Sequence, residues 1–169
     1  MGNEPHVVLP CKKAKNPCRC GAAAVQKYRQ RISGPLLDRI DLHIEVPAVS
    51  YEQLSGKAPG EPSEAIRSRV EAARRIQQER FRRTESRHRG TSCNARMSPR
   101  QLKDCCHLDD ACQELLRVAI SELNFSARAY DRILKVARTI ADLAAREQME
   151  AEHVSEAIQY RTLDRNLWV

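Results

Sequence analysis

Arg128 stands at a position in the sequence where a positive charge is unfavourable unless an anion lies nearby. It falls in the first turn of a helix that we expect to begin after Ser126. The positive end of a helix dipole disfavours a cation there by roughly 0.3–1 kcal/mol. The same helix end attracts anions, so an arginine at this position makes physical sense if a phosphate lies in front of it. The alternative is that Arg128 bends away to a nearby acid such as Asp131.

Arg39 is a second arginine with two interpretations, since it lies between Asp38 and Asp41. A surface salt bridge with these acids would be worth little. Its position favours another role. A rigid Pro-Leu-Leu segment precedes it, and a predicted strand of alternating apolar and polar residues follows it, so the guanidinium would be fixed at one edge of the fold. Fixed guanidinium groups are useful where charge develops on a transferring phosphoryl group.

Three cysteines near the start of the sequence are candidate metal ligands. Cys18 and Cys20 form a Cys-x-Cys pair, and Cys11 lies upstream. Tetrahedral zinc accepts such thiolates, although the spacing is imperfect, so both zinc binding and its absence stay open. The remaining cysteines are predicted to be small buried or incidental thiols, and His43 and His153 are predicted to be structural.

The sequence lacks a common nucleotide site. No Gly-x-x-x-x-Gly-Lys-Ser/Thr loop occurs, and no hydrophobic strand ends in paired acids that would hold magnesium. The chain therefore cannot bind and hydrolyse a nucleotide by that route alone.

The 169 residues carry a formal net charge of +7, and 30% of them are charged. Residues 64–89 contain nine Arg against four Glu, so this segment is a candidate for binding DNA, with Arg67, Arg74 and Arg75 as the candidate contacts. A solvated helix face is the alternative. No signal peptide and no apolar run of about 18 residues is found, so we expect a cytoplasmic protein without a membrane partner.

The elements that would position these residues are mostly helices. Residues 40–46 alternate apolar and polar side chains, which predicts a strand with one buried face whose partner strands lie elsewhere. Ser98, Asp109 and Ser126 are predicted helix caps. Helices are expected over residues 22–32 and 64–83. Four more are expected toward the C-terminus: one that begins at Pro99, one from the Asp109 cap to Leu123, one from Ser126 to about Ala145, and one over 151–161.

Three stretches, "ISGPLLDRIDLHIEVP", "NFSARAYDRILKVARTIADL" and "EHVSEAIQYR", carry a specific family resemblance. In order and spacing they resemble the C-terminal third of the magnesium-chelatase-like AAA+ ATPases of the competence protein ComM type, over about residues 16–165. The resemblance implies a mainly α fold: a helical lid preceded by a helical insert and the last strand of an incomplete α/β AAA+ core. It divides the chain into 1–48 (end of the core, with the cysteine segment), 49–94 (linker and basic helical insert) and 95–169 (helical lid).

The resemblance also implies roles for the two arginines. Arg39 would be the arginine finger that reaches ATP bound by a neighbouring subunit, and Arg128 would be the sensor 2 arginine that contacts the γ-phosphate. ATP and magnesium would be bound outside this chain, in the P-loop part of a longer parent protein. The family's members resemble hexameric motors that act on DNA, so the resemblance implies a homo-oligomer (a hexamer), DNA binding and branch migration during natural transformation.

One departure from the family concerns the cysteines, because "LPCKKAKNPC" does not reproduce the usual Cys-Pro-Cys-Gly that precedes the Cys-x-Cys pair. This departure and the missing ATPase core predict a piece of a longer protein that is inactive alone, and they make the zinc site doubtful. Two other functions stay open: a stand-alone basic helical module that binds DNA, and a fragment of a chelatase-type AAA+ subunit.

Overall fold

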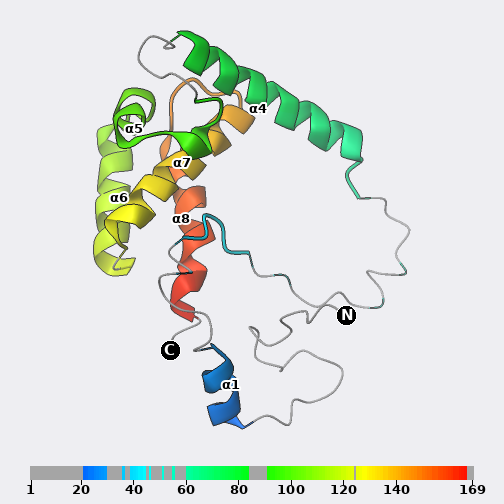
Figure 1. Cartoon of the computed structure of the whole chain (residues 1–169), viewed down its shortest axis with the longest axis vertical. Helices are drawn as coiled ribbons and strands as arrows, with labels where there is room; N and C mark the ends of the chain where they lie inside the picture. The colour runs from blue at the N-terminus through cyan, green and yellow to red at the C-terminus, as the bar shows by residue number, and fades with distance from the viewer. Residues whose placement is uncertain are drawn as a thin grey trace.

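Helices make up most of the computed structural model, which describes residues 21–29, 36, 39–44, 46, 51, 55, 60–83, 91–123 and 125–166. The predicted mainly α fold is confirmed. The helices α5 to α8 gather into a bundle, and α4 runs along its top and extends away from it (Figure 1). Their bounds are α1 Ala22–Arg29, α4 Ser63–Arg83, η2 Asn94–Arg96, α5 Pro99–Cys105, α6 Asp110–Leu123, α7 Ala127–Leu143 and α8 Ala151–Asn166.

The bundle helices begin where the sequence supplies a capping side chain. The Ser98 hydroxyl accepts the Gln101 N–H and the Gln101 side chain accepts the Ser98 N–H, which makes a capping box at the start of α5. Asp109 accepts the Cys112 N–H at 2.7 Å before α6. Ser126 accepts the Ala129 N–H at 3.1 Å before α7. All three predicted caps are therefore confirmed.

The end of α7 has a conformation that its sequence does not favour. Ala145 has a φ of 54°, in the left-handed region where an alanine is strained. The Ala145 N–H donates to the Asp142 carbonyl at 3.1 Å, and the Arg146 N–H donates to the Ala141 carbonyl at 2.8 Å. These two bonds form a Schellman motif, which normally has glycine at the left-handed position.

The hydrophobic core lies around α7, which contacts α4, η2, α5 and α8. Its inward side chains come from every bundle helix, and Phe81 of α4 joins them. The long α4 helix matches the predicted 64–83, but only its C-terminal half carries buried residues. The large apolar side chains of the core include Phe81, Met97, Leu102, Leu116, Ile133, Leu134, Met149, Val154 and Ile158.

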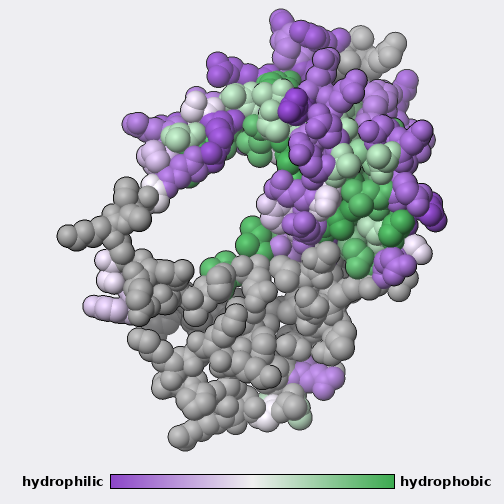
Figure 2. Space-filling view, turned by 180° about the vertical axis from the view of Figure 1, so that it is seen from behind, coloured by the Kyte–Doolittle hydropathy of each residue, from purple (hydrophilic) through white to green (hydrophobic). Residues whose placement is uncertain are grey.

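The N-terminal half of α4 projects from the bundle. Residues 63–72 are all exposed, including Ile66 and Val70. In Figure 2 this half of the helix stands clear of the other described residues, and much of its surface is hydrophilic. Within the described ranges, every helix is too short or too polar to cross a bilayer.

The strand predicted over 40–46 is not formed among the described residues of that segment. Its apolar side chains, expected to be buried, are exposed: Ile40 by 41%, Leu42 by 46%, Ile44 by 67% and Val46 by 69%. The physical reason is that a strand needs a hydrogen-bonded neighbour, and no other strand occurs in the described ranges. The division of the chain at residues 48 and 94 stays a prediction.

Candidate functional site

Arg39 lies in a turn and its side chain is exposed. Its backbone N–H donates to the Leu36 carbonyl at 3.0 Å. Asp41, one of the two acids considered as its partner, forms an ion pair with Arg132 of α7 instead. Arg39 forms no ion pair with a described residue, and Asp38 lies outside the described residues.

Residues 40–43, which follow Arg39, are attached to the bundle by polar contacts. Arg161 of α8, only 1% exposed, donates to the Ile40 carbonyl at 2.8 Å. The His43 N–H donates to the Tyr160 carbonyl at 2.8 Å. Together with the ion pair of Asp41, these contacts tie the segment to both α7 and α8.

Arg128 lies in the first turn of α7, as predicted, and its side chain is exposed. The Ser126 cap fixes the backbone of this turn and satisfies the Ala129 N–H. Arg128 makes no ion pair with Asp131 or with any other described residue. The arginine therefore stands at the positive end of a helix and forms no ion pair with a described residue, a setting that favours phosphate binding.

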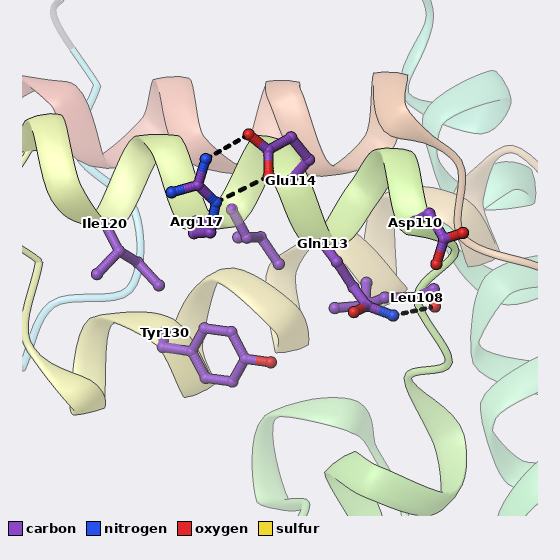
Figure 3. A pocket seen from close by; sticks show the side chains of 8 residues that line it. Leu108, Asp110, Gln113, Glu114, Arg117, Ile120 and Tyr130 are labelled. Atoms are coloured by element: carbon purple, nitrogen blue, oxygen red, sulfur yellow. Dashed lines mark hydrogen bonds and ion pairs between the residues drawn. The ribbon is translucent and has the colours of Figure 1, made fainter.

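A pocket of about 480 Å³ lies beside the first turns of α7, between Tyr130 and α6 (Figure 3). Two of its charged groups are already paired, because Arg117 donates to Glu114 at 2.8 Å and 2.6 Å. Gln113 donates to the Leu108 carbonyl at 3.1 Å. The described lining holds no serine, threonine, cysteine, lysine or histidine beside its carboxylates, so it offers no nucleophile–base pair of that kind.

Three arginines on α4 are exposed and make no ion pair with a described residue: Arg67, Arg74 and Arg75. Arg67 and Arg74 lie seven residues apart on nearly the same side of the helix, about 10 Å along its axis. By contrast, Arg69 binds Glu61 through two hydrogen bonds. The Glu79 carboxylate holds the arginines at the other end of the helix, Arg82 and Arg83.

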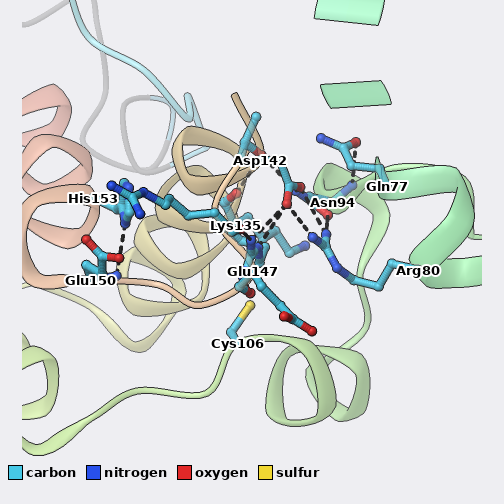
Figure 4. Close-up of polar contacts among 12 residues, drawn as sticks. Gln77, Arg80, Asn94, Cys106, Lys135, Asp142, Glu147, Glu150 and His153 are labelled. Carbon is cyan, nitrogen blue, oxygen red and sulfur yellow. Dashed lines mark hydrogen bonds and ion pairs between the residues drawn. The ribbon is translucent and has the colours of Figure 1, made fainter. Parts of the chain in front are cut away.

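A buried ionic cluster, which the sequence did not predict, joins α4 and η2 to α7 (Figure 4). Asp142 is 1% exposed and accepts hydrogen bonds from three side chains. Arg80 donates through both terminal nitrogens, Arg138 donates at 3.1 Å and 2.9 Å, and Asn94 donates at 2.7 Å. Burial lowers the pKa of Arg80, but the bond and charge of Asp142 raise it by more, so its pKa ends above the ordinary value. This cluster fixes α4 to the bundle.

The three cysteines proposed to bind zinc, Cys11, Cys18 and Cys20, lie outside the described residues. One cluster that is described, Glu150, Glu152 and His153, has ligand atoms close enough for a metal ion. However, the Glu150 N–H donates to Nδ1 of His153 at 2.9 Å, so the neutral ring carries its proton on Nε2 and has no lone pair there for a metal. His153 instead satisfies a free N–H at the start of α8, which confirms its structural role.

The cysteines that the structure describes behave as small buried groups, as predicted. Cys106 and Cys112 are buried, and Cys93 and Cys105 are partly buried. Burial raises the pKa of Cys106 to about 12, and burial together with Asp109 raises the pKa of Cys112 to about 11. The thiols of Cys106 and Cys112 are therefore protonated and poorly reactive near neutral pH.

Comparisons with known proteins agree with this arrangement. A model of the family described as magnesium chelatase, subunit ChlI C-terminal, matches residues 60–161, and one described as magnesium chelatase, subunit ChlI, matches residues 5–54. The chain is 38% identical over 150 residues to the competence protein ComM of Haemophilus influenzae, with 88% of this chain and 28% of that protein covered. It is 39% identical over 155 residues to the uncharacterized protein YifB of Salmonella typhimurium, with 90% and 28% covered. The chain thus spans less than a third of the length of these curated relatives.

Proposed function

The chain belongs to the magnesium chelatase ChlI family of AAA+ proteins, and from this premise we propose that it is the lid and arginine-finger part of an ATP-driven motor. In this proposal Arg39 reaches ATP held by a neighbouring subunit. Arg128 contacts the γ-phosphate of ATP held by the P-loop part of its own subunit. The P-loop, ATP and magnesium belong to a part of the parent protein that this chain does not contain.

The observation that carries the proposal is that neither arginine forms an ion pair with a described residue, although acids stand near both in the sequence. Asp41 pairs with Arg132 rather than with Arg39. Asp131 does not pair with Arg128 in the described part of the chain. Two exposed guanidinium groups, each fixed by a turn or a helix start, are suited to stabilise charge on a phosphoryl group.

Complementation tests this proposal. The chain is added to a P-loop part of a ComM-type protein, and the rate of ATP hydrolysis is measured. We expect a gain in rate that Arg39→Ala removes and that Arg96→Ala, a change at an exposed arginine in η2, leaves intact. No gain on adding the chain, or the same gain with Arg39→Ala, would show that the finger assignment is wrong.

The chain offers a matched control for Arg128. Arg100 occupies the same second helical position in α5, behind Ser98, as Arg128 occupies in α7, behind Ser126. Both arginines are exposed, so replacing either one removes the same unfavourable interaction with a helix dipole. We expect Arg128→Ala to slow hydrolysis at least about tenfold and Arg100→Ala to leave it unchanged. Equal effects of the two substitutions would contradict the sensor 2 role.

DNA is the second partner that we propose, on the strength of the projecting half of α4. Arg67, Arg74 and Arg75 lie exposed and unpaired with any described acid, so DNA phosphates would not have to displace one of these carboxylates. Phosphate contacts of this kind are independent of base sequence and release counterions. They would let the motor hold DNA while it hydrolyses ATP.

Fluorescence anisotropy with labelled duplex DNA at several salt concentrations tests this role. The slope of the logarithm of the binding constant against the logarithm of salt concentration reports the number of phosphate contacts. If one of the three arginines contacts a phosphate, replacing it by alanine should reduce the magnitude of this slope by about 0.9. Arg69→Ala, which removes an arginine bound to Glu61, serves as the control and should change the slope less. Absence of binding at low salt would remove this proposal. It would leave a chelatase-type assembly, named in the family description, as the remaining alternative.

A further inference from the structure

We propose that Arg132 and Arg161 are positioning residues that attach the Arg39 segment to the lid, so that Arg39 moves together with Arg128. Arg132 pairs with Asp41, two residues after Arg39. Arg161 donates to the carbonyl of Ile40, the residue directly after Arg39. The inference rests on the proposed function, because it assigns these residues a role through the finger.

Polar contacts rather than apolar packing hold the segment in place. Its apolar side chains are largely exposed, and a pocket of about 330 Å³ remains between Leu42 and Ile44 on one side and α7 and α8 on the other. Its described residues are also not part of a sheet. The contacts made by Arg132, by Arg161 and by the His43 N–H therefore set where the turn that carries Arg39 can lie.

The path between the two proposed phosphate-binding arginines is short. Arg132 lies one helical turn after Arg128 on α7, about 6 Å along the axis. Asp41 lies two residues from Arg39, a span of at most about 7 Å. One ion pair thus connects the helix turn that would sense ATP in one site with the turn that would reach ATP in the next site.

This connection gives the motor a way to link neighbouring sites. A shift of α7 caused by ATP at Arg128 would be carried through Arg132 and Asp41 to Arg39. Because Arg39 would act on a different ATP molecule, the state of one site would change the rate at the next. Arg161 would make the link rigid. Its side chain is almost fully buried at α8, so it holds the Ile40 carbonyl at one place against the bundle.

The ion pair can be tested without unfolding the chain, because its side chains are partly exposed, 27% for Arg132 and 53% for Asp41. We would measure hydrogen exchange of the His43 amide by NMR in the full chain. Arg132→Asp should speed this exchange about two- to fivefold, the range expected for losing a partly exposed ion pair. Adding Asp41→Arg to the same chain should restore the slow exchange. Arg117→Asp, which breaks an exposed ion pair on α6, should leave it unchanged.

The same variants are then assayed in the complemented ATPase. Arg132→Asp should lower kcat about tenfold, as expected for a misplaced catalytic group, with little change in KM for ATP. The charge-reversed double variant should recover kcat, which a merely structural defect would not do. Arg161→Met should also lower kcat. If Arg161→Met does not fold, the Arg132 variants alone test the positioning role.

The outcomes separate the inference from the function on which it rests. Unchanged His43 exchange in Arg132→Asp would show that the ion pair does not hold the segment. Faster exchange with normal kcat, in an assembly where Arg39→Ala abolishes hydrolysis, would show that the attachment does not position the finger. Normal hydrolysis with Arg39→Ala would instead refute the finger assignment itself, and with it any positioning role.

Discussion

Asp142→Asn should destabilise the chain more than its small change in shape would suggest. The carboxylate accepts five hydrogen bonds, two on one oxygen and three on the other. An asparagine offers one oxygen, so its amide group would face at least two donors. Among the described residues, the change also removes the only carboxylate that pairs with Arg138, whose side chain is 3% exposed. Removing one partner of a buried ion pair costs about 3–5 kcal/mol.

A loss of this size is a large share of the roughly 5–15 kcal/mol that stabilises a typical domain. Urea unfolding followed by circular dichroism would measure it, and the melting temperature should fall by about 12 °C or more. Asp131→Asn is the control on the same helix, because Asp131 has no ion pair in the described residues, and it should cost less than about 1 kcal/mol. A loss below about 1 kcal/mol for Asp142→Asn would refute the reasoning, since the arginines would then have found water or other partners.

Further predictions concern a helix end, a thiol and a cap. Ala145→Gly should stabilise the chain by about 1 kcal/mol, because glycine adopts the left-handed backbone conformation without strain. Ala144→Gly, at a φ of −80°, should destabilise it. Equal shifts of the melting temperature in the two variants would contradict this prediction. Burial raises the pKa of Cys106 to about 12, so this thiol should resist iodoacetamide at pH 8 in the folded chain, whereas Cys93 should react. Peptide mass spectrometry would measure the labelling of each cysteine, and equal labelling would refute the burial argument. The bond from the Cys112 N–H lowers the pKa of Asp109, so its stabilising effect is present above its unfolded pKa and is lost as pH falls through the folded value. Asp109→Asn should flatten the acid side of the stability curve, and an unchanged acid limb would count against the cap.

The helices could be predicted from the sequence because their starting signals are local. Ser98, Asp109 and Ser126 each bond to a backbone N–H three residues away, so the caps appear in the sequence itself. The helix α8 was predicted from Ala151 to about Arg161, but it continues to Asn166, where no sequence signal marks an end.

The strand and the polar contacts could not be predicted in the same way. An alternating pattern states which face of a strand would be buried, but it does not supply the neighbouring strand. The partners of Asp142 lie as far as 62 residues away, and Arg161 meets a carbonyl 121 residues away. One signal was present, because Arg138 and Asp142 fall four residues apart on the side of α7 that carries Leu134 and Ala141.

The two candidate arginines were found from sequence because each is out of place by a local rule. Arg128 is a cation at the start of a helix, and Arg39 follows a rigid segment beside acids. Sequence reasoning missed Arg132 and Arg161, since each of them has an ordinary position in a helix. Their contacts with residues 40 and 41 became visible only in the folded chain.

The central claim is that Arg39 acts on ATP held by another subunit, and a comparison of binding with turnover tests it most directly. In the complemented assembly we would measure both kcat and the affinity for ATP with Arg39→Ala. We predict that kcat falls about 1,000-fold or more, as for other arginine fingers, while ATP still binds. An unchanged kcat in an assembly that binds ATP normally would contradict it.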